Sequence, residues 1–112
     1  MSKLSTHVLD LVNGHPAAGM SLSLWRLDGA KRVRCRETRT NLDGRTDGPL
    51  LEGDELVAGT YEIVFQVGAY FLTPKDDVFL EEVPIRFVVQ EGSSYHIPLL
   101  CTPWAYQTYR GS

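Results

Sequence analysis

Residues 20–29 read Met20-Ser21-Leu22-Ser23-Leu24-Trp25-Arg26-Leu27-Asp28-Gly29, and apolar and polar side chains alternate through the first five positions. A period of two is typical of a β-strand with one buried face, here the face of Met20, Leu22 and Leu24. Asp28-Gly29 separates this run from a second strand-like segment at 31–40, and Asp-Gly between two such runs is a strong hairpin signal. The stretch therefore predicts two antiparallel strands.

Similar short segments continue on both sides of this hairpin. They span 4–11, 60–67, 83–89, 94–100 and 105–110. Turn signals such as Asn13-Gly14-His15-Pro16 and Asp43-Gly44 separate them, 48–59 reads as a loop, and 68–74 as a turn of helix. Pro84 suits the start of a strand and Pro98 an edge strand or a bulge. Seven or eight short strands with one short helix predict an all-β fold, an antiparallel β-sandwich forming one domain over 1–112.

The composition is that of an ordinary globular domain, with 112 residues, 43% hydrophobic residues and 22% charged residues. The formal net charge of −3 argues against nucleic acid or an anionic membrane as the main partner. Five of the eleven basic residues fall between Lys31 and Arg39. Arg32, Arg34 and Arg36 are expected to share one strand face, and such a stripe is typical of an edge strand protected by charge.

The two cysteines, Cys35 and Cys101, allow at most one disulfide. Each lies among apolar residues in a strand-like segment, where a buried free thiol is the common outcome. No signal peptide or membrane-spanning run is visible. A reducing, cytosol-like compartment is the default expectation.

The histidines are the first candidates for chemistry. His7 and His96 each lie within a predicted strand, on the face opposite their immediate neighbours. Either could be a catalytic group or a partly exposed strand histidine bonded to a neighbour. His15 lies in a turn and is expected to be solvated. Two histidines on separate strands, with no cysteine pair, do not supply the ligands of a zinc site within one chain.

Arg45 and the end of the chain are further candidates. Arg45 follows a turn that either leaves its guanidinium solvated or aims it at a carbonyl-rich or anionic ligand. The chain ends in Tyr109-Arg110-Gly111-Ser112, although most domains end in disordered polar residues. This ending is either an ordinary last strand with an added Gly-Ser or a functional terminus. No nucleophile elbow, phosphate-binding loop or zinc-protease motif occurs, so nothing indicates covalent catalysis.

Taken in order, several segments resemble one family, the transthyretin-like 5-hydroxyisourate hydrolases. The segments are Leu4-Ser5-Thr6-His7-Val8-Leu9-Asp10, Gly14-His15-Pro16-Ala17-Ala18-Gly19, Thr40-Asn41-Leu42-Asp43-Gly44-Arg45, Tyr95-His96-Ile97-Pro98-Leu99-Leu100 and Tyr106-Gln107-Thr108-Tyr109-Arg110-Gly111-Ser112. The resemblance runs from about Leu4 to the last residue. It departs from the family at Gln107, where serine is usual, and the decarboxylase half of some plant relatives is absent.

The resemblance implies a transthyretin-like (prealbumin-like) sandwich and an enzyme of urate degradation. The implied reaction converts 5-hydroxyisourate to 2-oxo-4-hydroxy-4-carboxy-5-ureidoimidazoline by attack of water on a ring carbonyl, without a cofactor or metal. His7 and His96 would share the roles of general base and acid. Arg45 would bind the substrate and stabilise negative charge, and Ser112 would orient a histidine or the water. Tyr109, Arg110 and Gly111 would line the substrate pocket.

The resemblance also implies a homotetramer, a dimer of dimers, with the sites in a central channel and the terminus held by a neighbouring subunit. No nucleic acid or membrane partner is expected. The ending Arg-Gly-Ser is no peroxisomal signal, which favours a bacterial cytoplasm over a peroxisome. Two rival readings are a transthyretin-like module that binds a small molecule without turning it over and an immunoglobulin-type adhesion domain. The adhesion domain would give His7, Arg45 and His96 no common task.

Overall fold

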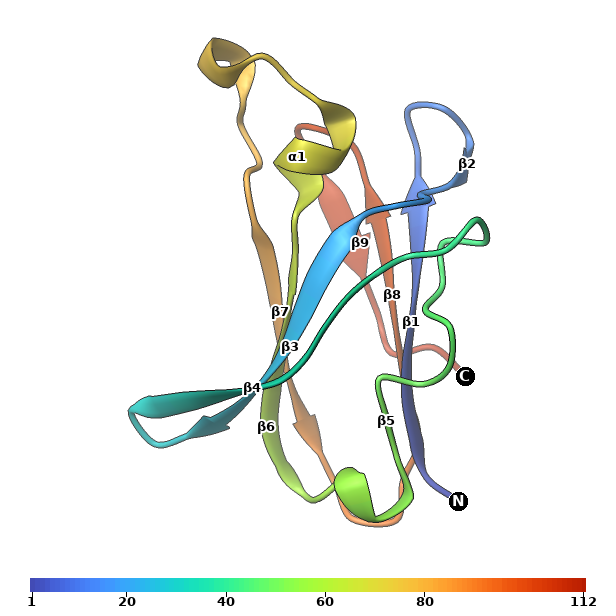
Figure 1. The fold of residues 1–112 in the computed structure, drawn as a ribbon, viewed down its shortest axis with the longest axis vertical. Helices are drawn as coiled ribbons and strands as arrows, with labels where there is room; N and C mark the ends of the chain where they lie inside the picture. Colours follow the sequence, from blue (N-terminus) through green and yellow to red (C-terminus); the bar gives the residue numbers. More distant parts are fainter.

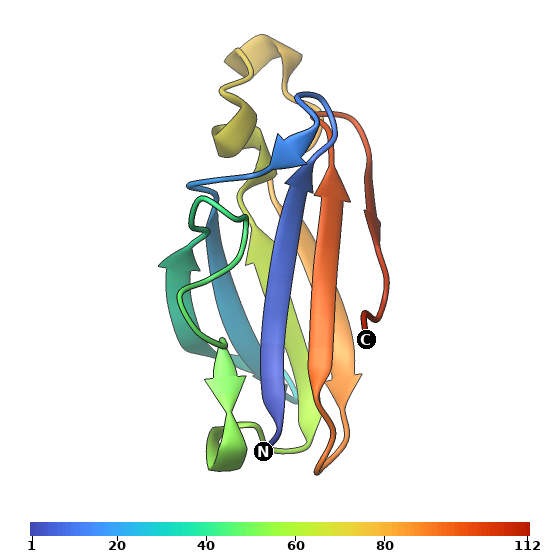
Figure 2. The ribbon, with the colours of Figure 1, turned by 90° about the vertical axis from the view of Figure 1, so that its right-hand side faces the viewer.

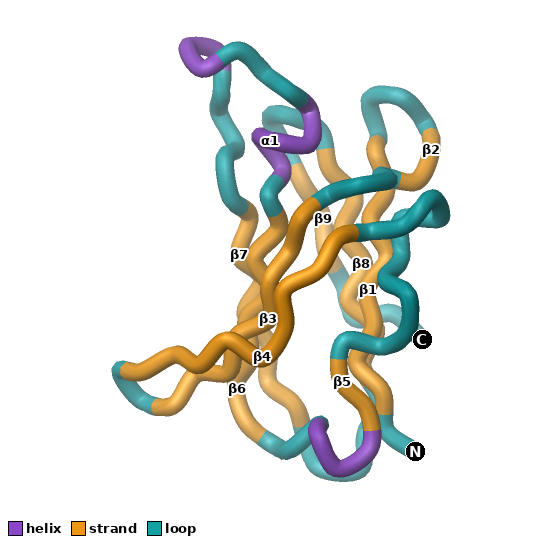
Figure 3. The backbone as a smooth tube through the Cα atoms, in the orientation of Figure 1, coloured by secondary structure: helices purple, strands orange, loops and turns teal.

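The hairpin predicted from 20–40 forms β3 (Ser21–Asp28) and β4 (Lys31–Arg39) in a computed structural model that describes all residues from Met1 to Ser112 (Figure 1). The other strands and the helices, drawn by type in Figure 3, are β1 (Lys3–Asp10), β2 (His15–Pro16), β5 (Leu51–Glu52), β6 (Gly59–Phe65), β7 (Val83–Val89), β8 (Tyr95–Cys101), β9 (Tyr106–Thr108), the α-helix α1 (Val67–Phe71) and the 3₁₀ turns η1 (Gly53–Glu55) and η2 (Lys75–Asp77). No helix is long and apolar enough to cross a membrane.

Two sheets pack face to face, which confirms the predicted sandwich. One is fully antiparallel, in the order β4-β3-β6-β7, and the other has the order β2-β1-β8-β9, with β5 also paired to β1. The pair β1–β8 is parallel, unlike the other pairs. Figure 2 shows these two strands side by side and pointing the same way. A parallel pair needs a long crossover connection, and here the rest of the sandwich supplies it.

The core lies between the inner faces of the two sheets. As the alternation predicted, Met20, Leu22 and Leu24 are buried, and they belong to a cluster of 20 buried residues. From the opposite sheet, β1 contributes Leu4 and Val8, which are fully buried. Each such side chain stabilises the fold by about 1.5–3 kcal/mol. The intervening residues of β1 and β8 therefore point out of the sandwich.

The basic strand β4 is an edge strand, as predicted, but its arginines do not share one face. A register shift in β4 places Arg34 opposite Trp25 and Arg36 opposite Leu24, whose side chains point to opposite faces. Arg36 donates to the Leu50 carbonyl at 3.2 Å, whereas the Arg32 guanidinium lies 3.9 Å from the centroid of the Trp25 ring. The extra residue of this β-bulge breaks the alternation that the prediction assumed.

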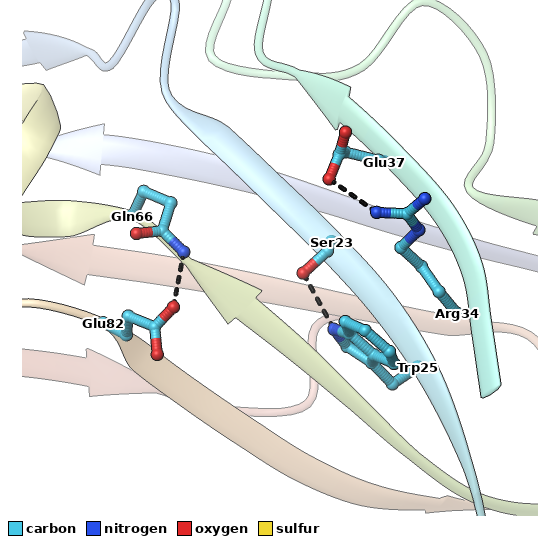
Figure 4. Close-up of polar contacts among 6 residues, drawn as sticks. All are labelled: Ser23, Trp25, Arg34, Glu37, Gln66 and Glu82. Carbon is cyan, nitrogen blue, oxygen red and sulfur yellow. Dashed lines mark hydrogen bonds and ion pairs between the residues drawn. The ribbon is translucent and has the colours of Figure 1, made fainter. Parts of the chain in front are cut away.

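The outer face of the sheet β4-β3-β6-β7 carries polar side-chain pairs, which Figure 4 shows in close-up. The Trp25 indole donates to the Ser23 hydroxyl at 2.9 Å, and Arg34 and Glu37 form an ion pair at 3.0 Å. Neither His7 nor His96 lies on this sheet. The candidate chemistry is therefore confined to the opposite sheet.

Three local predictions need correction or refinement. Pro98 lies in β8, an interior strand, and not at an edge. The segment 48–59, read as a loop, contains β5 and η1, because two residues of it pair with the start of β1. The last strand β9 has only three residues and not six. By contrast, Pro84 lies at the start of the edge strand β7, as predicted.

The cysteines are both free, as predicted, but only Cys101 is buried. Cys35 lies at the bulge of β4 and is half-buried.

Asp10, at the end of β1, connects the helix α1 to the sheet through a hydrogen bond with Tyr70. Its carboxylate accepts hydrogen bonds from the Asn13 side chain and the Tyr70 hydroxyl, both at 2.8 Å. It also accepts the backbone N–H groups of Val12 and Asn13. Burial raises the pKa of Asp10, but these hydrogen bonds outweigh burial and hold it below its ordinary value of 3.8. Burial, with the Asp10 contact, raises the pKa of Tyr70 to about 12.

Candidate active site

The two strand histidines lie on neighbouring strands, on the outer face of the sheet β2-β1-β8-β9. In the parallel register of β1 and β8, Ser5 lies opposite His96 and His7 opposite Pro98. The residues between them, among them Thr6 and Ile97, are buried on the inner face. The prediction that each histidine points away from its immediate neighbours is thus confirmed for both strands.

A closed turn brings Arg45 to the same region. The Asn41 side-chain oxygen accepts the backbone N–H groups of Asp43 and Arg45, and the Asn41 N–H donates to the Arg45 carbonyl at 2.7 Å. The Val8 N–H donates to the Gly44 carbonyl at 2.8 Å, which joins the turn to β1. Gly44 has a φ of +75°, and a Cβ there would overlap the Val8 carbonyl oxygen. Glycine is therefore required for the turn to lie beside His7.

The pKa of His96 is affected by its burial and by the two other candidate groups. Burial lowers the pKa of His96 below its ordinary value of 6.5, and the Arg45 guanidinium and His7 lower it further. A cation close to an imidazole disfavours a second positive charge. His96 is thus predominantly neutral near pH 7, a form that can accept a proton.

The imidazole of His96 has one side-chain partner, Ser5, which the sequence reading did not single out. The Ser5 hydroxyl lies 2.8 Å from Nδ1 of His96. Nε2 of His96 has no hydrogen-bond partner within the chain. Alternation along β1 would have placed Ser5 on the face of His7, but only the register with β8 places it beside His96.

The terminal segment lies against the other side of His96. The Gly111 N–H donates to the His96 carbonyl at 2.8 Å. A Cβ on Gly111 would come within 2.6 Å of Cδ2 of His96, so only glycine allows this close approach. Within one chain, β8 holds the terminal segment at Gly111, and the expectation that a neighbouring subunit holds Ser112 stays a prediction. Ser112 follows directly and lines the same hollow as His96.

This terminal segment continues the register of β9. The pair Leu99–Thr108 and the bridge His96–Gly111 lie on one antiparallel register, which is interrupted at Pro98. Proline has no N–H to donate, so a backbone hydrogen bond of the ladder is missing at that position. The Pro98 carbonyl accepts the Thr108 hydroxyl at 2.7 Å in place of a ladder bond.

Tyr109 and Arg110 lie where the ladder is interrupted, and they line a different hollow from the one at His96. The Arg110 guanidinium lies 4.3 Å from the centroid of the Tyr95 ring and donates to the Ser94 carbonyl at 3.1 Å. Tyr109 and Arg110 line a hollow of about 420 Å³ between β7 and the terminal segment. Within one chain they do not border the hollow at His96, so their assignment to substrate binding stays a prediction.

The hollow at His96 has a volume of about 210 Å³ and is open to solvent. Its walls are Lys3, Ser5, Ser94, Tyr95, His96 and Ser112. Larger hollows of about 530 Å³ lie over β3 and β4 and beside the N-terminus, away from both histidines. Pockets for small molecules usually enclose about 300–1,000 Å³. One chain therefore provides a reactive surface without enclosing a ligand.

Other candidate groups lie elsewhere. His15 is exposed, as predicted, but it lies in the short strand β2 and not in the turn before it. Its Nδ1 lies 2.9 Å from the Pro16 carbonyl oxygen. No group of three or more His, Cys, Asp or Glu side chains is arranged to hold a metal ion. The outer face of β1 and β8 thus carries two imidazoles and the Ser5 hydroxyl, and the turn joined to β1 at Val8 adds the guanidinium of Arg45. Such a set can move protons and stabilise an oxyanion.

Comparison with known proteins adds to this geometry. The profile of the HIUase/Transthyretin family matches residues 4–111. 5-Hydroxyisourate hydrolase 2 of Rhizobium meliloti (strain 1021) is 50% identical to this chain, over 98% of this chain and 96% of its own length.

Two solved structures are also similar. The 5-hydroxyisourate hydrolase of Klebsiella pneumoniae has a TM-score of 0.83 and 35% identity, covering 100% of both chains. An (S)-allantoin synthase has a TM-score of 0.91 and 40% identity, over 99% of this chain but 44% of that protein. The chain thus corresponds to less than half of the synthase but to the full length of the two hydrolases.

Proposed function

The chain belongs to the HIUase/transthyretin family, and we propose that it hydrolyses 5-hydroxyisourate. The observation that carries this proposal is the placement of His7 and His96 on the outer face of neighbouring strands, with Arg45 on a turn that is hydrogen-bonded to β1 at Val8. Burial, the Arg45 guanidinium and His7 together lower the pKa of His96. We infer the reaction from the similar proteins of Rhizobium meliloti and Klebsiella pneumoniae, both of which are named as 5-hydroxyisourate hydrolases.

The proposed reaction is general acid–base hydrolysis. A histidine takes a proton from water as the water oxygen bonds to a ring carbonyl carbon. The ring carbon–nitrogen bond then breaks, and the nitrogen receives a proton from the second acid–base group. His7 and His96 share these tasks, and Arg45 stabilises the negative charge on the carbonyl oxygen. Ser112 lines the hollow at His96 and orients the water or the imidazole. We assign no role to a cofactor.

The active form is proposed to be a homotetramer, a dimer of dimers. The hollow at His96 is open and small, so a second chain laid over the outer face of β1 and β8 would supply its missing walls. The edge strand β7 and the terminal segment each expose a large apolar side chain, Val88 at 59% and Tyr109 at 56% exposure. Edge strands of this kind are commonly completed by a two-fold partner. Through such contacts Tyr109, Arg110 and Gly111 could reach substrate.

The free thiols of Cys35 and Cys101 suit a reducing compartment such as a bacterial cytoplasm.

The direct test follows the ultraviolet absorbance of 5-hydroxyisourate generated in place from urate by urate oxidase. Decay of this absorbance is expected to be faster with the protein than without it. If the decay matched the spontaneous rate while the protein was folded and tetrameric, the hydrolase function would be wrong. A small-molecule binding module of the same fold would then be the better interpretation of the sandwich.

A further inference from the structure

We propose that Ser5 is a positioning residue for the reaction, which holds the imidazole of His96 and accepts its Nδ1–H when Nε2 takes a proton from water. The proposal rests on the proposed function and adds one residue and one proton assignment to it. It starts from the contact between the Ser5 hydroxyl and Nδ1 of His96 at 2.8 Å.

The register of β1 and β8 makes this contact a fixed feature of the sheet. Ser5 and His96 are directly paired residues of neighbouring parallel strands, with both side chains on the outer face. Figure 2 shows how closely these two strands run side by side. The backbones of both residues are held by the ladder, so the hydroxyl needs only one rotamer to reach the ring. On the other side, Gly111 packs against Cδ2 of the same ring. The imidazole is thus held between two groups of its own chain.

A hydroxyl suits this position because it can both donate and accept. When His96 takes a proton at Nε2, both ring nitrogens carry hydrogen, and Nδ1–H then needs an acceptor. The Ser5 oxygen supplies this acceptor without a change in the backbone. Nε2 has no partner within the chain and is the nitrogen left free to face water. The contact therefore favours His96 as the proton acceptor of the reaction.

Other charged groups around His96 act on its charge but do not hold its ring. His7 on β1 and Arg45 on the 41–45 turn both disfavour the protonated ring. Lys3 on β1 and the terminal residue Ser112 line the same hollow. None of them forms a hydrogen bond with the imidazole, whereas Ser5 does. Loss of the Ser5 oxygen would therefore leave the protonated ring without its only side-chain acceptor.

The test compares Ser5→Ala with Ser5→Thr, which keeps a hydroxyl, and with Ser23→Ala as a matched control. Ser23 is also a strand serine on an outer sheet face and also bonds an aromatic ring nitrogen, that of Trp25, as Figure 4 shows. Ser5→Ala is expected to lower kcat about tenfold, the effect of one hydrogen bond to a charged group. KM should change by less than about twofold, because Ser5 acts through His96. Ser5→Thr and Ser23→Ala should keep kcat within about threefold of the wild type.

A second readout needs no turnover. The imidazole ¹⁵N signals of His96 in the free protein report which nitrogen carries hydrogen and the pH at which the ring titrates. Ser5→Ala is expected to shift the His96 titration and the acidic limb of kcat to lower pH, because the charged ring has lost its acceptor. A merely structural defect would lower the melting temperature without moving the titration.

Two outcomes would overturn the proposal. One is a Ser5→Ala protein with the kcat of Ser23→Ala and an unmoved His96 titration. The other is a neutral wild-type His96 ring that carries its hydrogen on Nε2 and none on Nδ1, because Nε2 could then not take a proton from water. A wild-type protein that fails to accelerate decay of 5-hydroxyisourate would instead overturn the proposed function, and the titration distinguishes this case because it is measured without substrate.

Discussion

The imidazole of His96 owes its setting to residues of three kinds. A serine bonds its Nδ1, a glycine allows the terminal segment to lie against Cδ2, and burial, together with the Arg45 guanidinium on the 41–45 turn, depresses its pKa. None of these effects comes from residues adjacent to His96 in the chain. A histidine in an ordinary exposed strand would have none of them.

The first prediction concerns removal of this ring. His96→Ala should lower the hydrolysis rate at least about a hundredfold, since general acid–base groups contribute roughly 10²–10⁴-fold. The rate would be measured from the absorbance decay, and circular dichroism would verify the fold. His15→Ala is the matched control, because His15 is an exposed histidine of the short strand β2, away from His96. A folded His96→Ala protein that turns over like the wild type would remove His96 from the mechanism.

The second prediction concerns pH. The pKa of His96 is lowered below 6.5 by burial, Arg45 and His7, and a proton acceptor must be neutral. The acidic decline of the rate should therefore be centred below pH 6.5, the midpoint expected for a histidine with the ordinary pKa. The measurement is kcat/KM against pH, corrected for spontaneous decay. A rate that instead falls as the pH rises through this range would make His96 the proton donor.

At the scale of elements, alternation predicted the long strands but not their partners. The period of two placed β1, β3, β6, β7 and β8 within one or two residues, because half of each strand is buried in one core. The sequence carries no local signal for β5, which consists of two residues paired to β1. It also carries none for the bulge in β4, which sends Arg36 to the opposite face from Arg34.

For the candidate site, too, the sequence predicted the residues within single strands but not the contacts that depend on how strands pair. His7, Arg45 and His96 were identified from motifs of a family, and each histidine was placed on the correct face of its strand. Ser5 was missed because its contact depends on the register between two strands that are 91 residues apart in the chain. The position of Arg110 in a separate hollow was missed because it depends on the interruption of the β8–β9 ladder at Pro98.

The third prediction concerns the fastening of α1 by Asp10. Tyr70→Phe removes the hydroxyl that donates to the Asp10 carboxylate at 2.8 Å. Unfolding free energy should fall by about 1.5–3 kcal/mol at neutral pH, the value of a hydrogen bond to a charged group. The Asp10 contribution to stability is present above pH 3.8 and is lost as the pH falls through its lowered pKa. The difference between variant and wild type should therefore shrink in strong acid.

Denaturant unfolding at several pH values measures this effect. Tyr106→Phe is the control, since Tyr106 is 45% exposed and its hydroxyl has no hydrogen bond within the chain. Equal losses in the two variants would show that the Asp10 contact does not stabilise α1. The catalytic rate should change little in either variant, because Asp10 lies at the far end of β1 from Ser5.

At the scale of the whole molecule, the fourth prediction concerns assembly. Val88 on the edge strand β7 is 59% exposed, and Val33 on the opposite edge strand β4 is 58% exposed. Val88→Lys should weaken association and reduce activity, because a charge is costly to bury in an interface. Val33→Lys should leave both unchanged. Sedimentation velocity and the absorbance assay, run on the same samples, test this. A fully active monomer would contradict the proposal that a second chain completes the site.

The parallel pairing of β1 and β8 has a consequence for biosynthesis. The sheet β4-β3-β6-β7 is built from residues 21–89 and can form while the ribosome is still adding the last part of the chain. β1 leaves the ribosome first but finds its neighbour β8 only after 91 more residues, so this closure is slow and comes late. A nascent or prematurely terminated chain that ends before β8 therefore contains most of the sandwich but lacks His96, and so has no complete reaction centre. Hydrolysis can begin only after both ends of the polypeptide have met.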